Sequence, residues 1–205
     1  SVTDKPISHL VLTHYHAVRV LGASVFGAEQ IIMSDAARAM VVERGQEDWD
    51  SEFQRFPRLL EGHESIPGLT YPTTTFSEAM TVYLGKRRVD IKHIGRAPTA
   101  GGAVIHVPDP KVMFPGDTVE DPSACYCGAG YFADWGGTLD AIKAYGVDAI
   151  APGRGAALVG QDAVNRAIES TRNFVQSTYE PAAKVAMKGG SLKDAWDAVR
   201  AACDP

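Results

Sequence analysis

Short apolar stretches alternate along the chain with longer segments in which apolar residues recur every three or four positions. The apolar stretches at residues 7–13 (ISHLVLT) and 28–33 (AEQIIM) are rich in β-branched and other large apolar residues and predict buried strands. Further strands are predicted in the second half, bounded by glycine- and proline-containing turns: residues 80–84, 88–94, 103–107, 111–114 and 149–151.

The periodic segments predict helices at residues 34–44, 138–145, 161–177 and 191–202. In the first of them Ser34 is a helix-capping residue, Asp35 lies in the first turn and Gly45 follows the last turn, so the helix is expected to end there. The last two helices have the apolar spacing of surface helices packed on a sheet.

Strands in groups, with helices between the groups, indicate a layered α/β domain. The length of 205 residues suits a single domain over residues 1–205. Residues 46–68 are polar and aromatic, with Trp49, Phe53 and Phe56 at helix-like spacing, and are interpreted as a helical lid or insertion.

The composition narrows the choice of partners. Apolar residues make up 45% of the chain, which is enough for a sizeable core, and the formal net charge is −5. Nucleic acid and anionic membrane are therefore not expected as partners, because both are bound mainly through Lys and Arg. An apolar run of the length that crosses a bilayer, about 18 residues, is missing. Three cysteines do not suggest a disulfide framework, so a cytoplasmic location is expected.

Loop motifs that follow predicted strands carry a resemblance to a known family. Residues 13–22 (THYHAVRVLG) are similar to T-H-x-H-x-D-H-x-x-G, and residues 95–102 (GRAPTAGG) to G-x-A-H-T-x-G-D. Residues 112–117 (VMFPGD) match V-L-F-x-G-D, and residues 151–155 (APGRG) resemble V-P-G-H-G. In order and spacing these motifs resemble the metallo-β-lactamase superfamily, which implies an αββα sandwich over nearly the whole chain.

The same resemblance implies that the first sheet is incomplete in this chain. Members of that superfamily carry several dozen residues of strand before the first motif, which here begins at residue 13. The expectation is a fragment or processed chain, or a domain completed by a second polypeptide or by a homo-oligomer, because an unpaired sheet edge invites pairing.

The resemblance also implies a degenerate metal site. Of the family's His and Asp ligands, His14, His16 and the bridging carboxylate Asp117 are retained. The remaining ligand positions carry residues that do not bind cations, namely Val18, Arg19, Pro98 and Arg154. The favoured expectation is a site without metal, in which a guanidinium bridges to Asp117. The alternative is a single zinc or iron ion on His14, His16 and Asp117.

The reaction expected at such a site is hydrolysis or a lyase or proton-transfer step on a small, anionic molecule. His14, His16 and Asp117 are the candidate catalytic residues, with a histidine as general acid or base. The candidate substrate-binding residues are Arg19, Arg96, Arg154 and Thr99. Two alternatives stay open: a non-catalytic paralogue that serves as a binding or partner subunit, and a mononuclear metal hydrolase.

Simpler interpretations accompany these assignments. The two histidines could make only structural hydrogen bonds, and the arginines could form an ion pair without a substrate. Cys125 and Cys127 are expected to be small apolar residues rather than a thiolate or redox pair. The acidic residues near the same loop are expected to be solvated, namely Glu120, Asp121 and Asp134.

Overall fold

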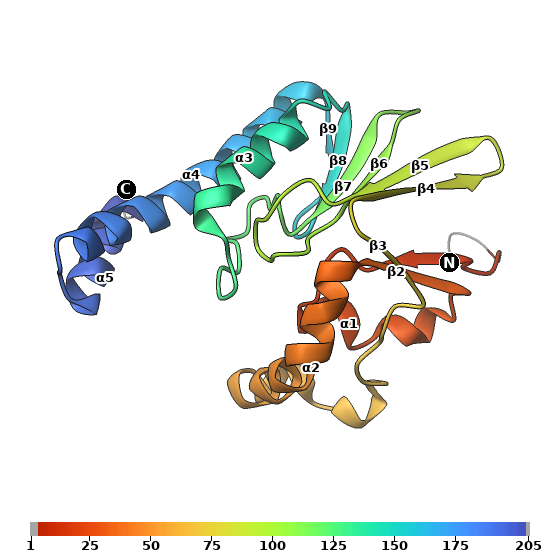
Figure 1. Ribbon diagram of the computed structural model, residues 1–205, viewed down its shortest axis with the longest axis horizontal. Coiled ribbons are helices and arrows are strands. Elements are labelled where there is room, and N and C mark those ends of the chain that lie inside the picture. The colour runs from red at the N-terminus through yellow and green to blue at the C-terminus, as the bar shows by residue number, and fades with distance from the viewer. Residues whose placement is uncertain (1–3, 204–205) are drawn as a thin grey trace.

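Two sheets form the centre of the molecule. The computed structural model describes residues 4–203 (Figure 1). The first sheet is parallel: β1 (His9–Val11) pairs with β2 (Gln30–Ser34), and β2 pairs with β3 (Thr74–Phe76). Four of the five residues of β2 are buried, as expected for an apolar strand covered on both faces.

The second sheet has six strands in chain order. Neighbouring strands are antiparallel except for β7 and β8, which are parallel. This parallel pair places the carboxyl ends of β7 and β8, and the loops that follow them, at one edge of the sheet. The strands are β4 (Ala79–Leu84), β5 (Arg87–Lys92), β6 (Val104–Val107), β7 (Val112–Gly116), β8 (Ala149–Pro152) and β9 (Leu158–Val159).

Helices cover the outer faces of the two sheets (Figure 1). The short α1 (Ala17–Val20) and the long α2 (Asp35–Arg55) lie on the side of the first sheet. On the side of the second sheet lie α3 (Phe132–Lys143) and α4 (Gln161–Met187), and α5 (Leu192–Cys203) folds back along α4. The expected α/β class and αββα sandwich are confirmed.

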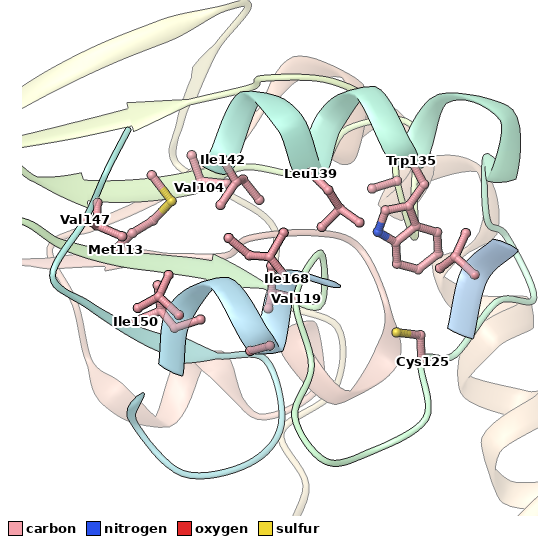
Figure 2. Close-up of a cluster of buried hydrophobic side chains, with 14 residues drawn as sticks. Val104, Met113, Val119, Cys125, Trp135, Leu139, Ile142, Val147, Ile150 and Ile168 are labelled. Carbon is pink, nitrogen blue, oxygen red and sulfur yellow. The ribbon is translucent and has the colours of Figure 1, made fainter. Parts of the chain in front are cut away.

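Three apolar clusters hold these layers together. Between the second sheet and its helices, Trp135, Leu139 and Ile168 are fully buried against Met113 and Ile150 (Figure 2). A cluster between the sheets contains Ile32, Phe76, Ile91 and Ala103, and another joins α2 to the first sheet. Full burial of a large apolar side chain contributes about 1.5–3 kcal/mol to the free energy of folding, so these clusters are the main source of stability.

The prediction that the first helix ends at Gly45 is wrong, because α2 continues to Arg55. Gly45 is buried on the face of α2 that meets Leu69, and an added Cβ would lie 3.1 Å from Leu69 Cδ1. The glycine therefore permits a close approach instead of ending the helix. The Ser34 cap is confirmed, since its side chain accepts a hydrogen bond from Ala37 N.

The region interpreted as a lid, residues 46–68, begins as the second half of α2. It continues with the 3₁₀ turns Pro57–Leu60 and His63–Ser65. The aromatic spacing brings the rings of Trp49 and Phe53 to a centroid distance of 5.2 Å, and Phe53 contacts His63. Whether this region moves as a lid stays a prediction.

Other boundaries differ more. The helix predicted over 138–145 begins at Phe132, and the one predicted over 161–177 runs on to Met187 with Pro181 inside it. Tertiary packing explains the second difference, because the extension lies against α5. The short α1, β3 and β9 had no clear periodic signal.

One side of β1 has no partner strand within residues 4–203, since the first sheet has the order β1-β2-β3. Beside it lies a groove of about 760 Å³, lined mainly by apolar side chains of both sheets and containing Phe26 and Phe114. Completion of this sheet by a second polypeptide stays a prediction. No helix in the described part of the chain combines the length and the apolar character needed to cross a bilayer.

Candidate functional site

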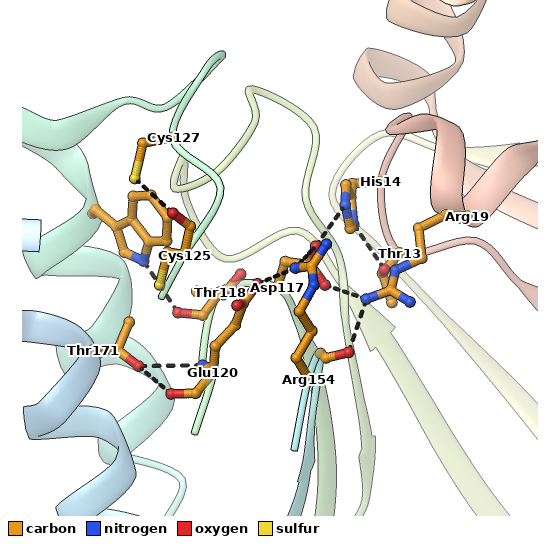
Figure 3. Close-up of polar contacts among 12 residues, drawn as sticks. Thr13, His14, Arg19, Asp117, Thr118, Glu120, Cys125, Cys127, Arg154 and Thr171 are labelled. Carbon is orange, nitrogen blue, oxygen red and sulfur yellow. Dashed lines mark hydrogen bonds and ion pairs between the residues drawn. The ribbon is translucent and has the colours of Figure 1, made fainter. Parts of the chain in front are cut away.

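The motif loops converge at one edge of the sheets. Residues 12–16 follow β1, Asp117 follows β7 and Arg154 follows β8. Backbone hydrogen bonds join the loops: Ala103 N donates to Thr13 O, and Asp121 N donates to Arg154 O. Segments distant in sequence thus meet around Asp117 (Figure 3).

Asp117 is the centre of the site and is 3% exposed. Its Oδ1 accepts a short hydrogen bond from Arg19 Nη2, and its Oδ2 accepts one from Arg154 Nη1 at 2.9 Å (Figure 3). His14 Nε2 lies 3.3 Å from Oδ2. Burial alone would raise the pKa of Asp117, but His14 and Arg19 outweigh it and hold that pKa well below its usual range.

Glu120 belongs to the same cluster, and the prediction that it is solvated is wrong. Its side chain is fully buried, and Oε1 accepts a hydrogen bond from the same Arg154 Nη1 that contacts Asp117. Its backbone N donates to Thr171 Oγ1 on α4, and that hydroxyl donates back to the Glu120 carbonyl. Burial, and then the neighbouring Asp117, raise the pKa of Glu120 to about 7.

His14 and His16 are both buried, and their rings meet edge to face at a centroid distance of 4.7 Å. His14 Nδ1 lies 3.0 Å from Thr13 Oγ1. In the described part of the chain, neither Nε2 atom makes a hydrogen bond of acceptable geometry, although buried polar atoms usually have partners. Burial, and then His14, lower the pKa of His16 to about 3, so His16 is neutral at physiological pH.

His14, His16 and Asp117 form a group that could hold one metal ion. Their ligand atoms lie within 4.8 Å of one another. Two imidazoles and one carboxylate are donors that suit zinc or iron. The hydrogen bonds of Asp117 argue against a bound metal ion, because both of its carboxylate oxygens already accept hydrogen bonds from guanidinium groups.

The other predicted substrate-binding residues differ in position. Thr99 is buried, shares a small cavity with His14 and Asp117, and its Oγ1 has no hydrogen-bond partner among residues 4–203. Arg96 is directed elsewhere: its Nη2 lies 2.6 Å from Asp134 Oδ2, and its guanidinium stacks on Tyr131. The structure therefore brings together Arg19, Arg154 and Thr99 with the histidines, but not Arg96.

The cysteines near the site do not behave as thiolates. Burial raises the pKa of Cys125 to about 12 and that of Cys127 to about 11. A metal-binding or nucleophilic cysteine needs a lowered pKa. Neither sulfur lies in the candidate metal group.

A cavity of about 260 Å³ opens beside His16. Its lining includes Arg44, Asp48, Glu52 and Arg55 of α2, together with Tyr126 and Arg154. The candidate general base and one arginine of the cluster thus face a space that a small molecule could enter.

Comparison with known proteins agrees with this arrangement. A family profile described as "Metallo-beta-lactamase superfamily" matches residues 1–154 of the 205. The chain belongs to the metallo-β-lactamase superfamily. The matched residues include the loops that follow β1, β7 and β8, which converge on Asp117.

Individual relatives are distant. A linear primary-alkylsulfatase from Pseudomonas sp. (strain ATCC 19151) is 22% identical over 221 residues, covering 92% of this chain and 42% of that protein. The chain thus spans less than half the length of this curated relative.

Solved structures show the same fold. A stereoselective inverting sec-alkylsulfatase from Pseudomonas sp. has a TM-score of 0.72 at 15% identity, covering 94% of this chain and 36% of that one. A metallo-β-lactamase from Pontibacter korlensis has a TM-score of 0.62 at 18% identity, covering 84% and 70%.

Proposed function

We propose that the protein is a hydrolase-type enzyme of the metallo-β-lactamase superfamily that acts on a small anionic molecule without a dinuclear metal centre. The observation that carries the proposal is the environment of Asp117. Both of its oxygens are held by guanidinium groups, from Arg19 and Arg154, while the buried Nε2 atom of His16 is left without a hydrogen bond in the described chain.

The charges of the cluster support a site without metal. Arg19 and Arg154 are balanced by Asp117 and Glu120, with which they form ion pairs. A divalent cation among these groups would face two guanidinium charges at short range, and like charges repel strongly where water is excluded. In this proposal the arginines supply the positive charge, and they occupy motif positions where the superfamily carries histidine ligands.

The arginines also keep donors for a substrate. Within residues 4–203, Arg154 makes its two ion pairs through Nη1, and Arg19 makes its two hydrogen bonds through Nη2. Their other N–H groups can bind an anionic oxygen. Negative charge that develops on a substrate oxygen would be stabilised by these preorganised donors.

His16 is the proposed general base. Its Nε2 has no hydrogen-bond donor among residues 4–203, so its lone pair can accept a proton from a water molecule while the water oxygen forms a bond to the electrophilic atom of the substrate. Since burial and His14 lower the pKa of His16 to about 3, this proton transfer depends on the bound anion, whose negative charge stabilises the imidazolium that forms. The bond to the leaving group then breaks, the leaving group retains the electron pair, and the same Nε2 returns the proton to it. The names of the relatives, an alkylsulfatase and a metallo-β-lactamase, support a hydrolytic reaction as analogy.

The test uses chelator-treated protein and a panel of anionic substrates: 4-nitrophenyl sulfate, 4-nitrophenyl phosphate and a chromogenic cephalosporin. Turnover of at least one is expected to survive chelation and to fall about 100-fold or more in His16→Gln, the usual contribution of a general base. His63→Gln, at an exposed histidine, is the matched control. Full activity in His16→Gln would refute the role of His16.

A mononuclear metal hydrolase is the second candidate, favoured by the three donors that lie within 4.8 Å of one another. His14, His16 and Asp117 would hold the ion, which would act as a Lewis acid. Elemental analysis of protein purified without chelator separates the two candidates. Near one equivalent of zinc or iron supports the second candidate, and less than about a tenth of an equivalent excludes a tight site.

A further inference from the structure

The cavity beside His16 differs from the Asp117 cluster in its chemistry. Tyr126 lines this cavity, and its ring meets that of His16 edge to face at a centroid distance of 5.1 Å. The guanidinium of Arg55 lies 5.8 Å from the Tyr126 centroid and 5.2 Å from that of Phe56. Planar side-chain groups therefore lie next to one another in space from residues 55 and 56, through Tyr126, to His16.

The charges of the cavity walls restrict the charge of a ligand. On α2, Arg44 and Arg55 are matched in number by Asp48 and Glu52, and Arg55 pairs with Glu52 at 2.5 Å. Arg154, which also lines the cavity, is paired with carboxylates through Nη1, and its other N–H groups have no hydrogen-bond partner among residues 4–203. A single anionic group can use these donors, whereas a multiply charged molecule would find no excess positive charge.

Size and contact surface restrict the body of the ligand. About 260 Å³ lies just below the range of roughly 300–1,000 Å³ that is usual for drug-sized ligands. Aromatic faces and a guanidinium plane bind flat π systems better than alkyl chains, because stacking and cation–π attraction add to the burial of apolar area. The space suits one or two fused rings.

We propose that this cavity binds a flat aromatic monoanion, with its charged group at Arg154 and its ring against Tyr126 and Arg55. This inference rests on the proposed function in that Arg154 and His16 face the same space. It goes further by assigning the substrate class and by making Tyr126 and Arg55 residues that determine specificity.

The test is isothermal titration calorimetry at pH 7.5 with three probes of similar size. Sodium 2-naphthoate has the ring and the charge, 2-naphthalenemethanol has the ring alone, and sodium octanoate has the charge alone. Naphthoate is expected to bind about 10-fold more tightly than either control, since a ring contact or a charge-assisted hydrogen bond each contributes that order of affinity. Octanoate binding as tightly as naphthoate would overturn the proposal.

Two variants locate the ligand. Tyr126→Leu is expected to weaken naphthoate about 5–10-fold and octanoate less than about 2-fold, because only the ring contact is lost. Arg154→Gln should weaken naphthoate but not 2-naphthalenemethanol. Tyr83→Leu, at an exposed tyrosine of β4, is the matched control. Arg55→Gln, at the other residue assigned to the ring, provides a second measurement should Tyr126→Leu lose its near-UV circular dichroism.

Unchanged naphthoate affinity in folded Tyr126→Leu or folded Arg55→Gln would overturn the assignment. The outcome is separable from that of the proposed function, because naphthoate carries no bond to be hydrolysed. Binding and turnover are both measured in the wild type: tight naphthoate binding by wild-type protein that turns over none of the three anionic substrates would remove the catalytic proposal alone. Active protein that shows no preference for naphthoate would remove this inference alone.

Discussion

Arg154 Nη1 lies 2.9 Å from Asp117 Oδ2, so that the side chain after β8 is paired with the side chain after β7. The backbones meet at the same point, since an added Cβ on Gly153 would lie 2.7 Å from Asp117 N. This pair joins the loops that follow β7 and β8.

Asp117→Asn should destabilise the protein, because the arginines lose their buried counterion. Breaking a buried ion pair costs about 3–5 kcal/mol, and the partial exposure of both guanidinium groups lowers the expected loss to about 2–4 kcal/mol. Urea unfolding at pH 7 measures it, with Asp162→Asn on the exposed face of α4 as control. A loss as small as that of the control would mean that the pair adds no stability.

Glu120 should make stability depend on pH near neutrality. Its folded pKa of about 7 lies above the usual 4.5, so the folded state binds the proton more tightly than the unfolded state. The resulting stabilisation is fully present below pH 4.5 and is lost as the pH rises through 7, by an amount on the order of 3 kcal/mol.

The comparison of wild type with Glu120→Gln isolates this effect. Between pH 5 and 8 the wild type should lose stability relative to the variant, whose amide does not titrate. Urea midpoints at unit pH steps provide the measurement, and Glu43→Gln, at an exposed site on α2, should run parallel to the wild type. A Glu120→Gln curve parallel to the wild type would show that Glu120 does not titrate in this range.

Removal of the guanidinium groups should improve metal binding. In the double variant Arg19→Gln, Arg154→Gln, both oxygens of Asp117 are released to join His14 and His16 as ligands. Zinc affinity is expected to rise about 10-fold or more, because two repelling charges are lost. Calorimetric titration of chelator-treated protein with zinc chloride measures it. Adding His14→Ala should abolish the gain; an unchanged affinity in the double variant would contradict the electrostatic account.

Two glycines should respond to alanine in opposite ways. At Gly153 a Cβ would lie 2.2 Å from Asp117 Oδ1, so alanine must displace the site and should cost about 2–4 kcal/mol. At Gly137 in α3 a Cβ meets no described atom within 4 Å, so alanine should stabilise by about 0.5–1 kcal/mol. Thermal and urea unfolding measure both, and equal shifts would contradict the packing argument.

The sequence by itself determined the αββα layers, seven of the strands, the motif loops and the retention of His14, His16 and Asp117. Local sequence patterns specify these features: apolar periodicity, a capping serine, and residues placed directly after strands. The pairing of arginine with Asp117 was expected from the motif positions alone. Arg19 and Arg154 stand where ligands of the metal are expected, and a guanidinium can replace the metal as the counterion of the carboxylate.

Only the tertiary structure decided which polar residues meet. Glu120 is separated from Arg154 by 34 residues, and nothing local distinguishes it from a solvated acid. Arg96 stands in a motif, yet Asp134 on α3 holds it away from the cluster. Gly45 was predicted to end a helix, but it lies inside α2, where it packs against Leu69. In each case the deciding contact is long-range, so burial and charge pairing became defined only when the chain was folded.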